Sequence, residues 1–166
     1  MDVEKIIKVK AVDGKLVELS TKAASKSSVL RGLIEDYPDN DELPLPANTV
    51  NGNELEKIKE YLIHYQDIEE PPKIAKPLKS NDFRECCEDD WDYKFVGDNN
   101  NEILALIRAA NYLDIKPLLE LLSAKVACKI RGTTTESIRK DFGIENINKD
   151  EETQINDDKK YLEATL

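Results

Sequence analysis

Two short stretches of alternating polar and apolar residues flank Asp13-Gly14 near the start of the chain. Residues 6–11 and 15–19 each place their apolar side chains on one face, with the period of two that β-strands show. Asp-Gly accepts the positive φ that a tight primed turn requires. The sequence therefore predicts a β-hairpin, so the fold contains a sheet despite the helical patterns that follow.

Helical periodicity dominates the rest of the chain. Stripes of apolar residues spaced three or four apart predict helices, and these stripes run over residues 29–34, 55–65, 103–113 and 118–130. Ser20-Thr21 can cap the first of these helices, and Pro117 suits the first turn of the last one. Residues 43–46 suit a short edge strand, because each proline pushes the preceding residue toward extended geometry. This order of elements predicts an α+β fold with an excess of helix.

Residues 111–116 read Asn-Tyr-Leu-Asp-Ile-Lys and connect two of the predicted helices. We expect a polar, exposed corner there, after which the chain restarts as a helix at Pro117. The corner contains no catalytic group. It therefore favours binding over chemistry.

Two other segments differ from the helical pattern. Residues 67–82 carry Pro71-Pro72, Pro77 and many charges, which is typical of a linker. Residues 148–162 begin with a capping box formed by Asn148 and Glu151, but this segment has few apolar residues to hold it on a core. We expect the final segment to be loose alone and ordered on a partner.

No arrangement of residues points to an enzyme. His64 is the one histidine and is interpreted as a helix-surface or packed residue, because triads and multi-histidine metal sites need more partners. Cys86-Cys87 lacks chelating spacing, and Cys128 is expected to be a small core residue.

A cluster of acidic residues, Asp89, Asp90 and Asp92, could suggest a calcium site. It lacks the glycine and the closing glutamate of a calcium loop. These residues are therefore interpreted as a solvated cap before a short helix carrying Trp91 and Phe95. The sequence predicts no catalytic residue, no metal and no cofactor.

The charge and the chain start limit the partners and the compartment. A net charge of −10 argues against nucleic acid and against an anionic membrane surface. The charged first residues predict no signal peptide, and three cysteines in an odd count fit a reducing compartment, cytoplasmic or nuclear. We therefore expect a non-enzymatic interaction protein.

The joint order of several motifs resembles the S-phase kinase-associated protein 1 family, the small adaptor of SCF (cullin–F-box) ubiquitin ligases. The motifs are Ile7-Lys8-Val9 with Asp13-Gly14, Leu45-Pro46, Trp91-Asp92-x-x-Phe95, Ala109-Ala110-Asn111-Tyr112-Leu113-Asp114-Ile115-Lys116, Gly132-x-Thr134, Ile138-Arg139-Lys140-x-Phe142-x-Ile144 and Glu151-Glu152-x-Gln154 with Tyr161. They cover nearly the whole chain.

This resemblance implies a BTB/POZ fold with a C-terminal helical extension that docks an F-box. Its parts would be residues 1–66 and 91–131 for the BTB/POZ domain, 67–90 for an acidic linker, and 132–166 for the extension. It implies a cullin-facing surface with Asn111, Tyr112 and Val126. It implies an F-box surface whose members are Ile103, Leu104, Ile107, Phe142, Ile144, Ile155 and Tyr161. For each of these aliphatic residues, ordinary core packing is the alternative. A homodimer of the unbound chain also fits an exposed F-box surface.

Departures from the family mark a divergent member. Lys59 stands where relatives carry an aliphatic residue near the cullin surface, so it must reach solvent, find an opposite charge or face another partner. Thr135 replaces a frequent proline, and Tyr161 replaces a tryptophan. Besides the cullin–F-box adaptor, the sequence leaves open a structural subunit that stabilises an F-box-like protein in a cullin-free assembly. An elongin-C-like adaptor is a weaker alternative, because such proteins lack the segment after Gly132.

Overall fold

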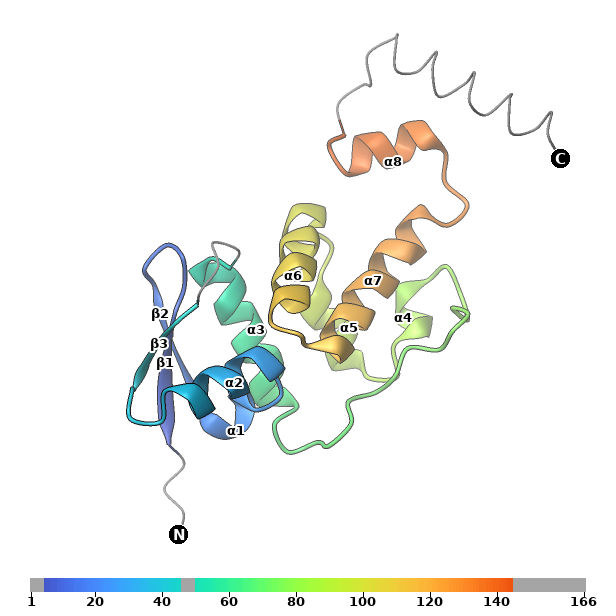
Figure 1. The fold of residues 1–166 in the computed structure, drawn as a ribbon. Coiled ribbons are helices and arrows are strands. Elements are labelled where there is room, and N and C mark those ends of the chain that lie inside the picture. The colour runs from blue at the N-terminus through green and yellow to red at the C-terminus, as the bar shows by residue number, and fades with distance from the viewer. Residues whose placement is uncertain (1–4, 46–49, 145–166) are drawn as a thin grey trace, which may run out of the picture. The chain divides into compact units, whose positions relative to one another are not determined.

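A computed structural model describes residues 5–45 and 50–144 of the chain (Figure 1). The chain divides into two units, Met1–Arg131 and Gly132–Leu166. Within its described residues, the first unit combines one small sheet with helices α1 to α7, and the second carries α8. This composition confirms the predicted α+β class.

The N-terminal hairpin lies where it is predicted, although its turn differs. Strand β1 (Ile6–Lys10) pairs antiparallel with β2 (Leu16–Ser20). The turn closes with the Ala11 amide donating to the Lys15 carbonyl and the Gly14 amide donating to the Ala11 carbonyl. Gly14 has a φ of +84°, whereas Asp13 is not among the described residues with positive φ. The connection is therefore a three-residue loop that ends in a left-handed glycine, and the expectation of a primed turn was wrong.

The Asp13 side chain also connects the hairpin to a helix distant in the sequence. Its Oδ1 accepts from the Lys15 amide at 3.1 Å, and its Oδ2 accepts from the Gly52 amide at 3.0 Å. These backbone bonds, that of Gly52 first, lower the pKa of Asp13. Gly52 begins α3 (Gly52–His64), where a Cβ would lie only 2.6 Å from the Cβ of Lys15. A glycine is needed there so that the helix start can lie against the hairpin.

The sheet is completed by a short edge strand. Strand β3 (Glu42–Pro44) pairs parallel with β1, which gives the order β2-β1-β3. A short edge strand was expected over residues 43–46. The strand is confirmed at residues 43–44, residue 45 lies beyond its end, and residue 46 is outside the described residues. Proline is tolerated in such a strand because an edge leaves one row of backbone groups unpaired.

The segment after β2 forms two helices. Ser20 caps α1 (Thr21–Ala24) by accepting from the Ala23 amide at 3.1 Å. Ser27 then caps α2 (Ser28–Asp36) by accepting from the Leu30 amide at 3.2 Å. The predicted cap and helix are confirmed, but the break between α1 and α2 was not predicted.

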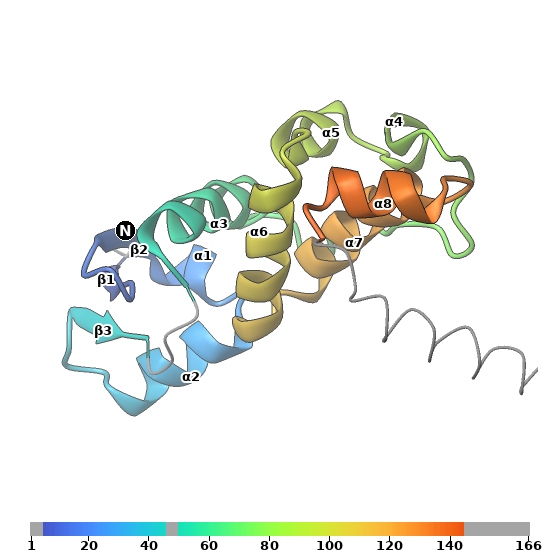
Figure 2. The ribbon, with the colours of Figure 1, turned by 90° about the horizontal axis from the view of Figure 1, so that it is seen from above.

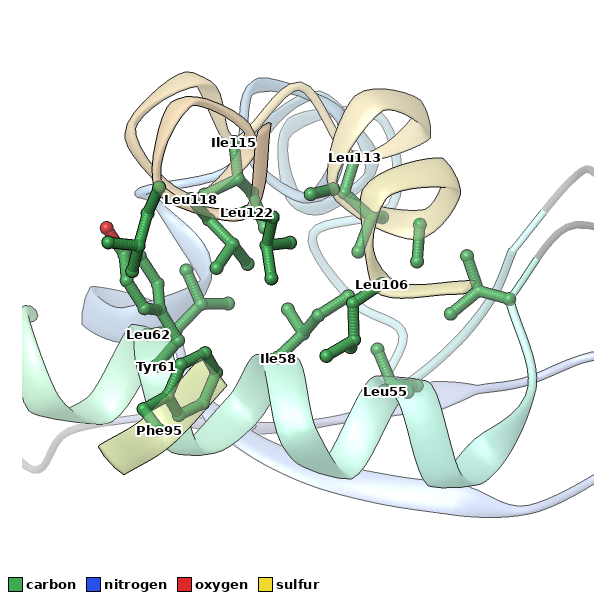
Figure 3. Close-up of a cluster of buried hydrophobic side chains, with 14 of the residues drawn as sticks. Leu55, Ile58, Tyr61, Leu62, Phe95, Leu106, Leu113, Ile115, Leu118 and Leu122 are labelled. Atoms are coloured by element: carbon green, nitrogen blue, oxygen red, sulfur yellow. The ribbon is translucent and has the colours of Figure 1, made fainter. Parts of the chain in front are cut away.

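Helices α3, α6 (Asn100–Tyr112) and α7 (Lys116–Ile130) build the core of the first unit. α3 packs on the sheet and on α6, and α6 packs on α7 (Figure 2). Apolar side chains of these three helices, of the turn between α6 and α7 and of one further helix meet in one cluster (Figure 3). Its labelled members are Leu55, Ile58, Tyr61, Leu62, Phe95, Leu106, Leu113, Ile115, Leu118 and Leu122. Buried residues recur along α7 from Leu118 to Cys128.

A short helix that the sequence did not predict follows the proline-rich segment. Helix α4 (Phe83–Cys86) starts at the cap Asp82 and buries both of its end residues. It packs against α7 and against α5 (Asp90–Val96), the predicted short helix with Trp91 and Phe95.

The second unit is described over one short helix, α8 (Thr135–Asp141). Thr134 caps it by accepting from the Ser137 amide at 3.3 Å. Gly143 has a φ of +62°, and the Ile144 amide donates to the Arg139 carbonyl at 2.9 Å, which ends the helix. The predicted helix over residues 148–162 lies outside the described residues.

Across residues 5–45 and 50–144, no helix combines the length and the apolar character that a membrane span requires.

Candidate functional site

The corner at residues 111–116 is only partly a surface. Leu113 and Ile115 are 0% and 2% exposed, whereas Asn111 and Asp114 are exposed. The Leu113 amide donates to the Ala109 carbonyl at 2.9 Å, which closes the end of α6. The expectation of a polar, exposed corner holds for the polar residues and is wrong for the two aliphatic ones, which anchor the corner in the core.

The turn itself depends on a left-handed residue. Asp114 has a φ of +52° and is the one non-glycine residue with positive φ in the described part of the chain. This backbone region is unfavourable for most side chains and is tolerated best by aspartate and asparagine after glycine. The Asp-Ile step can therefore reverse the chain without a glycine.

Two serines at the start of helix α2 hydrogen-bond to this corner. The Ser27 hydroxyl donates to the Leu113 carbonyl at 2.6 Å, and Ser27 is fully buried. The Ser28 hydroxyl donates to Oδ2 of Asp114, also at 2.6 Å. Both bonds join residues 86 positions apart. No local sequence signal identifies them, because Ser27 and Ser28 look like ordinary helix-start residues.

The three residues that the resemblance assigns to a cullin-facing surface do not form one cluster. Asn111 is exposed and Tyr112 is half-buried at the end of α6, so these two share the corner. Val126 is half-buried on α7, ten residues after that helix begins at Lys116. Ten residues of α-helix span about 15 Å. A partner that contacts all three must therefore extend along α7.

Lys59 lies in a shallow hollow on the outer side of α3. The hollow is also lined by Glu56, Glu60 and Glu102, and Lys59 is half-buried in it. A lysine stem can cover apolar surface here while its ammonium reaches carboxylates and water. Glu102 lies in the first turn of α6, nine residues and about 14 Å along the helix from Asn111. The hollow therefore lies at the start of α6, whereas the corner lies at the end of that helix.

The residues assigned to an F-box surface divide into three groups. Ile103 is 1% exposed and belongs to the core, so the alternative interpretation applies to it and its side chain offers no surface. Leu104 and Ile107 are half-buried and three apart on α6. In the second unit, Phe142 is half-buried at the end of α8 and Ile144 is 51% exposed. Ile155 and Tyr161 lie outside the described residues.

An aromatic cluster joins α3 to α5. The Trp91 ring stacks on His64 with centroids 3.7 Å apart and on Phe95 at 4.9 Å. His64 is thus a surface histidine that covers the tryptophan, as the sequence suggested. The Tyr65 hydroxyl donates to Oδ1 of Asp92 at 2.7 Å.

Asp92 is not part of a solvated cap, which corrects that prediction. It is 4% exposed, and burial raises its pKa above the usual 3.8, while the bond from Tyr65 opposes this rise. Asp89 does cap α5 through the Trp91 amide at 2.9 Å, and Asp90 contacts Arg84 at 3.0 Å. The hydrogen bond from Tyr65, 27 residues earlier, offsets part of the cost of burying the Asp92 carboxylate.

The described residues contain no group of three or more side chains that could hold a metal ion. Cys86 and Cys128 are buried, the latter as predicted.

Comparison with known proteins gives two matching domain descriptions. "Skp1 family, tetramerisation domain" matches residues 5–67, and "Skp1 family, dimerisation domain" matches residues 116–161. Similar curated proteins include the "S-phase kinase-associated protein 1 homolog" of Tetrahymena thermophila, 37% identical over 95% of this chain and 93% of that protein. The "E3 ubiquitin ligase complex SCF subunit sconC" of Emericella nidulans is 36% identical over 96% of this chain and 98% of its own length. The "SCF ubiquitin ligase complex protein SKP1a" of Dictyostelium discoideum is 34% identical over 95% and 96%.

Proposed function

The chain belongs to the Skp1 family, and from this premise we propose that it is a non-enzymatic adaptor that bridges a cullin to F-box proteins in an SCF ubiquitin ligase. The observation that carries the proposal is similarity along 96% of the chain to a relative named as an SCF subunit, which itself is covered over 98% of its length. The order of elements, a small sheet followed by helices and a separate C-terminal unit, agrees with this function.

We assign the first partner surface to the exposed corner. Asn111 and Tyr112 would contact the cullin, and Val126 would extend that contact along α7. The support is physical: the corner is held on a buried base by Leu113, Ile115 and the bond from Ser27. A surface fixed in this way loses little conformational entropy when a partner binds.

We propose that an F-box protein contacts apolar side chains of each unit separately, those on α6 in the first unit and those at the end of α8 in the second. Leu104, Ile107, Phe142 and Ile144 would contact the F-box, together with Ile155 and Tyr161. Ile144 is 51% exposed, so its side chain is accessible to a partner. When no F-box protein is present, the same side chains could pair two copies of the chain, and light scattering at increasing concentration tests this homodimer.

The decisive experiment measures both partners with the full-length chain. We expect wild-type protein to bind a purified cullin N-terminal domain and an F-box protein simultaneously, as a ternary complex in size-exclusion chromatography with light scattering. Phe142→Ala should weaken F-box binding by about 2 kcal/mol, roughly thirtyfold, and leave cullin binding unchanged. Asn111→Ala combined with Tyr112→Ala should do the opposite.

Tyr37→Ala is the matched control, because Tyr37 is a 52% exposed aromatic residue outside both surfaces. It should change neither affinity. Failure of the wild-type chain to bind cullin, with F-box binding intact, would refute the bridging role.

That outcome would favour a structural subunit of a cullin-free assembly. Lys59 is the observation behind this alternative, because the family resemblance places an aliphatic residue at its position. If Lys59→Ile creates cullin binding that the wild-type chain lacks, the alternative is supported. Unchanged binding in both proteins shows instead that the Lys59 hollow lies outside the cullin surface.

A further inference from the structure

Two of the three cysteines meet in the interior of the first unit. The Sγ atoms of Cys86 and Cys128 lie 3.9 Å apart, although the residues are 42 positions apart in the chain. Cys86 ends α4, and Cys128 lies in the last turn of α7. The packing of α4 on α7 therefore brings the two thiols together.

The surroundings hold both thiols in one place. Cys86 and Cys128 are 6% and 7% exposed. Their Sγ atoms share one acceptor, the carbonyl of Ser80, at 3.4 Å and 3.7 Å. One oxygen that accepts from both sulfurs fixes them on the same side of the segment that precedes α4. Cys87 is the half-buried neighbour and differs from this pair in exposure.

We propose that Cys86 and Cys128 are a site of reversible disulfide formation, oxidised by a low-molecular-weight disulfide such as oxidised glutathione. One thiol loses its proton and attacks the glutathione disulfide, which forms a mixed disulfide and releases one glutathione thiolate. The second protein thiol then attacks the mixed disulfide, forms the Cys86–Cys128 bond and releases the second glutathione. Two protein thiols are oxidised and one glutathione disulfide is reduced to two thiols, so atoms and electrons balance.

The geometry requires only a small movement. A disulfide has an S–S distance of about 2.05 Å, so the sulfurs must approach by roughly 2 Å, which rotation about the side-chain bonds can supply. The alternative pair, Cys86 with Cys87, joins adjacent residues and is unfavourable for the backbone. Burial raises the pKa of Cys128 to about 11 and that of Cys87 to about 12, so exchange at neutral pH is slow and the reaction must be followed to equilibrium.

Oxidation would join α4 to the end of α7. Cys128 lies two residues before α7 ends at Ile130, and the second unit follows at Gly132. A cross-link between residues 42 positions apart lowers the entropy of the unfolded chain, so the oxidised protein should resist urea better than the reduced one. This inference does not depend on the proposed adaptor function.

The experiment equilibrates the full-length chain in buffers with a graded ratio of reduced to oxidised glutathione. After acid quenching and alkylation of free thiols, mass spectrometry identifies the linked peptides without reduction. We expect a mass loss of two hydrogens and a peptide pair that joins Cys86 to Cys128. The urea midpoint, followed by Trp91 fluorescence, should increase on oxidation and return after dithiothreitol.

Two variants make the result specific. Cys87→Ser should keep the same linked peptides and the same shift of the urea midpoint. Cys128→Ser should lose both, and its reduced form must show the circular dichroism of the wild-type protein. Only glutathione adducts, or links that require Cys87, would overturn the proposal.

Discussion

Replacing Tyr65 with phenylalanine isolates one buried polar contact. The substitution keeps the ring, whose edge lies against Trp91 with centroids 5.8 Å apart, and removes only the hydroxyl that donates to Asp92 at 2.7 Å. Tyr65 and Asp92 are 2% and 4% exposed, so water has little access to replace the lost donor. The variant therefore leaves a buried carboxylate with one donor fewer.

The expected cost depends on the charge of Asp92. A hydrogen bond to an ionised group contributes about 2 kcal/mol to the free energy of unfolding, and one to a neutral group contributes about 1 kcal/mol. Burial raises the folded-state pKa of Asp92 above 3.8, with a smaller contribution from Asp89. The stability that this raised pKa contributes is complete below the unfolded-state pKa and is lost as pH rises through the folded-state pKa. Tyr65→Phe removes the hydrogen bond that lowers this pKa, so the folded-state pKa of Asp92 rises further. The variant therefore loses more stability than the wild-type protein as the pH increases.

We therefore expect Tyr65→Phe to cost about 1 kcal/mol at about pH 4 and about 2 kcal/mol at pH 7. Urea denaturation between these pH values measures the cost, and Trp91 is a suitable probe because it is the one tryptophan and contacts this cluster. In an Asp92→Asn background the cost of Tyr65→Phe should be the same at every pH, since the partner of the Tyr65 hydroxyl no longer titrates. Tyr37→Phe, at an exposed tyrosine, should have no effect. Equal costs at pH 4 and pH 7 in the wild-type background would refute the reasoning.

Three further substitutions test the corner and the core. Ser27→Ala removes the cap of α2 and the bond to the Leu113 carbonyl, so the free energy of unfolding from urea denaturation should decrease by about 2 kcal/mol. Asp114→Val places a β-branched residue at a φ of +52° and should cost more than about 1 kcal/mol in the same assay, whereas Asp114→Asn should cost little. Leu122→Ala empties a fully buried site and should cost about 3 kcal/mol, seen as a lower Tm in calorimetry.

Each of these substitutions has a control within the chain. Ser25→Ala changes an exposed serine beside the same helices, and a cost equal to that of Ser27→Ala would contradict the role of the α2 contact. Leu16→Ala changes a leucine that is 42% exposed, so its effect should be well below that of Leu122→Ala.

Local patterns in the sequence identified most of the elements. The alternation around Asp13-Gly14 and the stripe at residues 55–65 predicted a hairpin and a helix that the structure confirms. These features depend on neighbours within a few residues, so a single sequence contains the information. Helix α4 was missed because its four residues are too short for periodicity and follow a charged, proline-rich stretch.

The candidate site was predictable only in part. Motif order identified the family and pointed to residues 111–116, but it could not separate Ile103 in the core from Leu104 and Ile107 at the surface. All three lie on one helix at spacings that fit either role. Their exposure depends on which helices pack against α6.

The sequence by itself determined most of the elements, their order and the family, because these follow from propensity, periodicity and motif spacing. Only the tertiary structure decided which distant residues meet: Ser27 with Leu113, Tyr65 with Asp92, and Cys86 with Cys128. The physical reason is that burial and pairing are properties of a packed neighbourhood. Such a neighbourhood exists only after segments far apart in the chain have been brought together.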